Sequence, residues 1–290
     1  MVSPTVKSLR PSRLKEALEF RAEHKALPFA GGTDLMVRFR GYSGTIPKLA
    51  APVLFLDALE ELKVIDIEEN TLRIGAGITM AELLDFSGTP ELIRRAVQLI
   101  AAPALRNRAT LGGNICNASP AADSLPPLYV HKARVTLVSV NGERSLSIDE
   151  FLTGPGKTAL KENEILLTIE VPLFLAAGRL YYRKVGTRKA NALSKLSAAG
   201  YAFIDGGTVS EFRFALGAVA PTVIRLPESE VLVKGSKTKD LDSDEILKLA
   251  EGRIWPIDDQ RSTADYRKQV ALNTLKEFLE QLKTTVPEAI

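Results

Sequence analysis

The sequence has very few side chains of the kinds that bind transition metals. Its 290 residues include one cysteine, Cys116, and two histidines, His24 and His131. A structural zinc site usually takes four cysteine or histidine ligands, and a cysteine-held iron–sulfur cluster takes four thiolates. We therefore expect no metal site on this chain. A single cysteine also excludes an intrachain disulfide, so redox chemistry here would need an organic cofactor or a partner's metal.

Long apolar runs and an excess of one charge are also missing. No apolar run approaches the roughly 20 residues that span a bilayer, and residues 1–13 lack the apolar region of a secretory signal. We therefore expect a cytoplasmic protein without a membrane span. The 38 basic and 35 acidic residues are mixed along the chain and give a net charge of +3. Because no basic stripe stands out, nucleic acid is not an expected partner.

The composition is that of a folded globular protein, with 45% apolar and 25% charged residues. Since typical domains have roughly 100–200 residues, a chain of this length predicts two domains, or one domain with subdomains. The hydrophobic pattern changes after Gly178, which places a boundary near residue 175. The predicted class is α+β.

Helix and strand patterns follow one another along the chain. Helices are predicted over residues 12–25, 33–40, 79–86, from residue 89, 243–251 and 263–283. Strands are predicted over 27–30, 53–56, 164–171, 180–185 and 209–219, with hairpins over 63–76 and 134–148. Ser12 is a candidate helix cap, and Thr79 with Glu82 forms a capping-box signal. Residues 193–204 fit a helix or a strand, and residues 102–127 are expected to be irregular because they show no clear period.

Two glycine-rich loops are the candidate ligand site. The first is Pro28-Phe29-Ala30-Gly31-Gly32-Thr33-Asp34-Leu35, where a predicted strand meets a predicted helix. The second is Thr110-Leu111-Gly112-Gly113-Asn114. Glycine lets backbone N–H groups approach a ligand closely, and a helix start has unpaired N–H groups and a partial positive charge. Both loops are therefore candidates for binding a pyrophosphate, although each could also be a plain tight turn.

The two common nucleotide motifs are not found. Gly75-Ala76-Gly77 is followed by Met80 where the third glycine of G-x-G-x-x-G should stand, and G-x-x-x-x-G-K-[ST] does not occur. A nucleotide on this chain would therefore not be held in a Rossmann or P-loop manner. A persuasive acid–base pair is missing as well, so we expect no catalytic residue.

Longer motifs around the glycine loops resemble the FAD-binding medium subunits of the molybdenum hydroxylases, such as carbon monoxide dehydrogenase and xanthine dehydrogenase. The motifs are residues 30–35, 106–115 and 118–123. The similarity continues through residues 164–167, 182–184 and 259–262, and so covers nearly the whole chain. The resemblance implies a p-cresol methylhydroxylase-type FAD-binding domain over 1–175, with α+β subdomains of about 1–57 and 58–175. A small α+β C-terminal domain over 176–290 would follow.

The resemblance also implies roles for individual residues. Pro28–Leu35 and Thr110–Asn114 would wrap the FAD pyrophosphate, and Asp123 would meet a polar group on the ribose or adenine side. Ile100, Leu166 and Lys184 match positions that line the flavin. A cation such as Lys184 would favour the anionic reduced ring. Structural interpretations remain open beside these: Asp123 as a helix cap, Lys184 as a solvated charge and Leu166 as core.

The function implied by the resemblance is electron transfer within a complex. FAD would be held non-covalently, since residues 28–35 contain no histidine or cysteine. A large subunit with a molybdenum cofactor and a small subunit with two 2Fe–2S clusters would complete a heterotrimer, itself dimerised. Electrons would pass from the clusters through FAD to an external acceptor. The alternatives are a self-contained FAD-dependent oxidoreductase of the same fold superfamily and a non-catalytic nucleotide-binding module.

Overall fold

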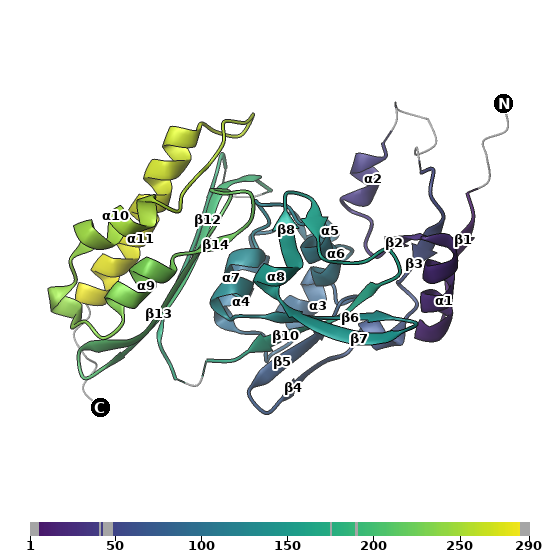
Figure 1. Ribbon diagram of the computed structural model, residues 1–290, viewed down its shortest axis with the longest axis horizontal. Coiled ribbons are helices and arrows are strands. Elements are labelled where there is room, and N and C mark those ends of the chain that lie inside the picture. The colour runs from purple at the N-terminus through teal and green to yellow at the C-terminus, as the bar shows by residue number, and fades with distance from the viewer. Residues whose placement is uncertain (1–5, 41, 43–48, 175, 189–190, 285–290) are drawn as a thin grey trace. The chain divides into compact units, whose positions relative to one another are not determined.

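The computed structural model describes residues 6–40, 42, 49–174, 176–188 and 191–284 (Figure 1). The chain forms two compact units, each built from separate segments. The first unit consists of Met1–Thr89, Ala101–Asn117 and Ala133–Pro172. The second consists of Pro90–Ile100, Ala118–Lys132 and Leu173–Ile290. Two short segments that precede residue 175 in the sequence are thus part of the second unit.

The N-terminal part of the first unit is a small parallel sheet with one helix. Its strands are β1 (Ser8–Leu9), β2 (Leu27–Phe29) and β3 (Val53–Phe55), in the order β1-β3-β2. Helix α1 (Leu14–His24) has Arg13 as its N-cap residue, and the Arg13 side chain makes no capping hydrogen bond. The expectation of a Ser12 cap is therefore wrong. Glu61 takes that place, because its Oε1 accepts from the Leu14 N–H at 3.1 Å. The short helix α2 (Leu35–Arg38) follows the first glycine loop.

The rest of the first unit is built on a five-stranded antiparallel sheet of order β4-β5-β10-β6-β7. The strands are β4 (Ile65–Glu68), β5 (Thr71–Gly75), β6 (Arg134–Ser139), β7 (Gly142–Ser147) and β10 (Ile165–Pro172). Both predicted hairpins are confirmed by the pairing of β4 with β5 and of β6 with β7. Strand β10 lies in the middle, and its residues from Ile165 to Ile169 are all buried. The small hairpin of β8 (Leu152–Gly154) and β9 (Lys157–Thr158) precedes it.

Short helices surround this sheet. They are η1 (Glu60–Leu62), α3 (Met80–Asp85), α5 (Pro103–Arg106), α6 (Leu111–Cys116) and α8 (Ile148–Phe151). The predicted capping box is confirmed at α3, where Thr79 and Glu82 each accept from the other's backbone N–H. The expectation of an irregular stretch over residues 102–127 is wrong, since it contains α5, α6 and the start of α7 (Leu125–Val130). Helices of four to six residues are too short to show a hydrophobic period.

The second unit is a four-stranded antiparallel sheet between helices. Its strands are β11 (Arg179–Gly186), β12 (Ser194–Asp205), β13 (Thr208–Gly217) and β14 (Ile224–Arg225), in that order. The helices are α4 (Glu91–Val97), α7, α9 (Pro227–Val233), η2 (Thr238–Asp240), α10 (Ser243–Glu251) and α11 (Ala264–Thr284). Helix α11 packs on one face of the sheet and α7 on the other (Figure 1).

Burial on both faces explains the ambiguous pattern of residues 193–204. This segment forms most of strand β12, in which Ser194 and the continuous run from Leu196 to Ala202 are buried. A strand covered on both faces loses the alternation of apolar and polar residues that marks a half-buried strand. In the described ranges, none of the helices combines the length and the apolar character that a membrane span requires.

Candidate cofactor site

A cavity of about 350 Å³ in the first unit brings the two glycine loops together. From the first loop it is lined by Pro28 and by Ala30 to Leu35, and from the second by Thr110, Gly112, Gly113 and Asn114. Leu166 of β10 also lines it. Two residues of the glycine loops do not line it: Phe29 packs its ring on Phe55, with centroids 5.1 Å apart, and Leu111 is fully buried.

The first loop can only be built with glycine. A Cβ on Gly31 would lie 1.9 Å from the carbonyl oxygen of Arg108. Gly32 has φ of +74°, and a Cβ there would lie 2.3 Å from the Phe29 ring. Both residues thus bring the backbone closer to its surroundings than any side chain allows.

This loop also has free backbone donors. The first helical bond runs from the Met36 N–H to the Gly32 carbonyl at 2.9 Å. Among the hydrogen bonds of the described residues, the N–H groups of Thr33, Asp34 and Leu35 have no acceptor. Three consecutive free N–H groups on a glycine turn form a concave site for an anion.

The second loop differs, because its N–H groups already have protein acceptors. Those of Leu111 and Gly112 donate to the carbonyls of Ile78 and Ala76 at 3.0 and 3.1 Å. The Gly113 N–H donates to Thr110 Oγ1, which caps α6. A Cβ on Gly112 would lie 2.5 Å from the Ala76 oxygen. The second loop therefore shapes the cavity by close packing against the end of β5, while the first loop provides the donors.

Three polar residues of the lining were not identified from the sequence, namely Arg21, Arg38 and Asn117. Arg38 donates through Nη2 to Asn117 Oδ1 at 2.9 Å, and Asn117 Nδ2 donates to Asp34 Oδ2 at 2.5 Å. Arg21 of α1 is the third. In the sequence, Asn117 lies between the motifs of residues 106–115 and 118–123.

The partly exposed Cys116 also lines this cavity. Burial raises the pKa of the Cys116 thiol to about 12, so it stays protonated near neutral pH. Within the residues that the structure describes, no three or more Cys, His, Asp or Glu side chains are grouped as a metal site.

The remaining predicted residues lie in the second unit. Lys184 of β11 places Nζ 2.8 Å from Asp123 Oδ2 and 2.8 Å from the carbonyl oxygen of Leu99. Ser194 donates its hydroxyl to Asp123 Oδ1. Burial raises the pKa of the Asp123 carboxyl, and the contacts with Lys184 and Ser194 oppose that shift. Asp123 is thus an ion-pair partner rather than a helix cap, and Lys184 is not a solvated charge. Ile100, at the end of the turn after α4, is partly exposed.

The first unit's cavity fits a cofactor with a pyrophosphate. It offers free N–H groups at Thr33–Leu35, and Arg21 and Arg38 are cations in its lining. It also has apolar walls, formed by Leu27, Leu56, Leu62, Leu160, Ile165 and Leu166. Ligand pockets of this kind pair mostly apolar walls with a few polar groups that fix orientation.

Comparison with known protein families assigns the class. Residues 4–174 match the family described as "FAD binding domain in molybdopterin dehydrogenase". Residues 181–282 match the "CO dehydrogenase flavoprotein C-terminal domain". The first match alone covers more than half of the chain, which therefore belongs to the family of FAD-binding domains of molybdopterin dehydrogenases.

Individual relatives match over nearly their full length. The glyceraldehyde dehydrogenase medium chain of Sulfolobus acidocaldarius is 30% identical over 287 residues, covering 97% of this chain and 99% of that protein. A putative xanthine dehydrogenase FAD-binding subunit of Escherichia coli K12 is 30% identical over 280 residues, covering 94% of each. A solved carbon monoxide dehydrogenase of Hydrogenophaga pseudoflava superposes with a TM-score of 0.87 at 28% identity, covering 96% of each chain. The α+β class and the two-part fold predicted from the sequence are thereby confirmed.

Proposed function

We propose that this chain is the FAD-binding electron-transfer subunit of a molybdenum-containing hydroxylase or dehydrogenase complex. It is an oxidoreductase flavoprotein by family, and its relatives are the FAD or medium subunits of such complexes. The observation that carries the proposal is the cavity that joins both glycine motifs in a chain matching those subunits from end to end. Bound FAD supplies reversible electron uptake and release, while the protein binds, orients and tunes it.

The residues of the first unit would hold the dinucleotide part of the cofactor. The N–H groups of Thr33, Asp34 and Leu35 would donate to the pyrophosphate, and Gly112 and Gly113 would let it approach. The turn of the first glycine loop is formed by residues 28–32: Pro28, Phe29, Ala30, Gly31 and Gly32. Leu111 anchors the second loop in the core. Thr110, Asn114 and Leu166 complete the wall.

We also propose the flavin-lining roles that the family resemblance implies for Lys184 and Ile100. Lys184 has three N–H donors, of which Asp123 and Leu99 take two. The third would donate to the flavin ring and favour its anionic reduced form. Asp123 would hold Lys184 in place rather than bind the ribose, and Ile100 would add an apolar contact.

The partners would be an iron–sulfur small subunit and a molybdenum-cofactor large subunit, in a heterotrimer that dimerises. We expect substrate oxidation to take place on the partner subunits rather than on this chain. Residues 1–175 would form the FAD-binding domain and residues 176–290 the C-terminal domain, in keeping with the ends of the two family matches. We also propose a cytoplasmic location.

The test is reconstitution. The purified chain, supplied with FAD, should become yellow and be reducible by dithionite, but should not oxidise aldehydes, N-heterocycles or carbon monoxide with an artificial dye. Activity should appear when the iron–sulfur and molybdenum subunits are added. Robust turnover by the single chain would instead support a self-contained flavoenzyme.

A further inference from the structure

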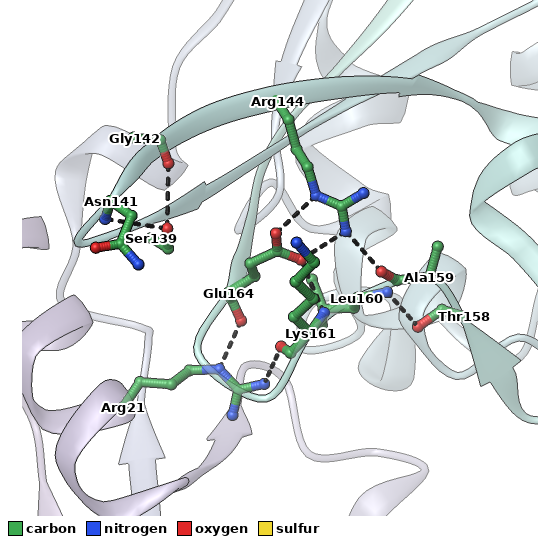
Figure 2. Close-up of polar contacts among 10 residues, drawn as sticks. All are labelled: Arg21, Ser139, Asn141, Gly142, Arg144, Thr158, Ala159, Leu160, Lys161 and Glu164. Carbon is green, nitrogen blue, oxygen red and sulfur yellow. Dashed lines mark hydrogen bonds and ion pairs between the residues drawn. The ribbon is translucent and has the colours of Figure 1, made fainter.

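Arg21 is a buried cation on the inner face of helix α1, where it lines the cavity. The residue is only 7% exposed to solvent. Its Nε donates to the carbonyl oxygen of Glu164 at 2.5 Å, and Nη2 donates to that of Lys161 at 3.4 Å (Figure 2). Nη1 donates to the carbonyl oxygen of Ala26. One guanidinium therefore joins the end of α1 to a loop more than a hundred residues away.

Each of these three carbonyls lies next to an apolar residue of the cavity wall. Ala26 precedes Leu27, Lys161 follows Leu160, and Glu164 precedes Ile165. Leu27, Leu160 and Ile165 all line the cavity. Arg21 therefore links the backbone beside Leu27 to the backbone beside Leu160 and Ile165.

A second arginine, Arg144, binds the same loop, residues 159–164, from outside the cavity. Arg144 of β7 pairs with Glu164 through two parallel contacts, Nε to Oε1 at 2.7 Å and Nη2 to Oε2 at 2.8 Å (Figure 2). It also donates to the carbonyl oxygen of Ala159 at 2.7 Å. Arg144 is not part of the cavity lining. The two arginines thus stabilise one loop, but only Arg21 faces the cavity.

No carboxylate pairs directly with the Arg21 charge: Glu162 and Glu164 act on it at longer range, and they form ion pairs with Lys25 and Arg144. Among the described residues, no carboxylate lies within ion-pair distance of its guanidinium, whose contacts are all with neutral carbonyls. Burial lowers the pKa of Arg21, and an arginine nevertheless remains protonated. Burying a charge that has no direct ion-pair partner is costly unless an anion offsets it, and the pyrophosphate of FAD is such an anion.

We propose that Arg21 is a positioning residue for FAD, which fixes the walls around Leu27, Leu160 and Ile165 and balances the charge of the pyrophosphate. The inference rests on the proposed function. It adds to the two glycine motifs a determinant of cofactor affinity that lies outside both of them.

The experiment compares three variants of the full chain after removal and re-addition of FAD. Arg21→Met removes both roles, Arg21→Lys keeps the charge but reaches fewer carbonyls, and Arg144→Met is the matched control on the outer side of the loop. The FAD dissociation constant would be measured by fluorescence quenching at several salt concentrations, and thermal unfolding would be followed for each apoprotein.

We expect Arg21→Met to weaken FAD binding at least tenfold and to reduce its salt dependence. Arg21→Lys should bind FAD with intermediate affinity and keep the wild-type salt dependence, because screening acts on the retained charge. Arg144→Met should lower the melting temperature and change the affinity less than threefold.

Two results would overturn the inference alone: wild-type affinity in both Arg21 variants, or equal losses of affinity in Arg21→Met and Arg144→Met. If Arg21→Met does not fold, Arg21→Lys still decides, since wild-type affinity there shows that the three carbonyl contacts are not needed. A wild-type chain that binds no FAD would overturn the proposed function as well.

Discussion

Lys184 and Asp123 form an ion pair of 2.8 Å in which both side chains are more than nine-tenths buried. Asp123 is also held by Ser194, and Lys184 by the carbonyl of Leu99. Pairs of this kind are stable only when further hydrogen bonds offset the cost of burying the charges, and Ser194 and the Leu99 carbonyl provide such bonds here. The pair therefore ties strands β11 and β12 to the segment that follows the second glycine motif.

Replacing Lys184 by Met should destabilise the apoprotein by about 3–5 kcal/mol at neutral pH, because Asp123 would remain buried without its cation. Burial already raises the pKa of Asp123, and loss of Lys184 should raise it further. A group whose pKa is raised on folding contributes stability below that pKa and loses it as the pH rises. The deficit of Lys184→Met should therefore shrink as the pH falls, as measured by urea unfolding. The double variant with Asp123→Leu is the control and should lose less than Lys184→Met alone.

Replacing Gly32 by Ala should reduce both stability and FAD occupancy. Gly32 has φ of +74°, and an added Cβ would strike the Phe29 ring. Gly207 is the matched control, since it has φ of +79° but open space around a Cβ. Gly207→Ala should lose about 1 kcal/mol from backbone strain alone and keep its flavin. Melting temperature and flavin absorbance report the two effects, and equal flavin contents in the two variants would contradict the loop assignment.

Replacing Glu164 by Gln should reduce stability by about 1–2 kcal/mol at neutral pH, a modest value because Arg144 is about one-third exposed. The hydrogen bond from Arg144 holds the pKa of Glu164 below its usual range. A lowered pKa contributes stability above the ordinary value of about 4.3, and this contribution is lost as the pH falls through the folded value. As the pH falls below about 4, the free energy of unfolding should therefore decrease less in the variant than in the wild type. Glu143→Gln, at an exposed position beside Arg144, should behave like the wild type.

FAD should be released when the holoprotein is precipitated with acid. The described lining of the cavity contains no histidine, and its cysteine, Cys116, is a partly exposed thiol whose raised pKa leaves little nucleophilic thiolate. The supernatant should be yellow and the pellet colourless after centrifugation. Flavin absorbance that stays in the washed pellet would show a covalent link.

Much of the local structure could be predicted from neighbouring residues. The Thr79–Glu82 capping box joins residues three apart, and the turn at Val140 and Asn141 lies between strands β6 and β7, which pair directly. Such signals are short-range, so the residues that cause them are visible side by side in the sequence. The sequence by itself also identified both glycine loops, and the cavity brings them together.

Only the tertiary structure decided the rest. Residues 193–204 form strand β12 because helices cover both of its faces, which no pattern within the segment could show. Arg21 reaches a carbonyl 143 residues away, and Asn117 reaches Asp34 across 83 residues. The division of labour between the loops, with donors in the first and packing in the second, likewise depends on which acceptors the fold brings to each N–H. Hydrogen-bond partners so distant in sequence are chosen by the packing of the whole unit, because a buried donor must be satisfied by whatever acceptor lies beside it.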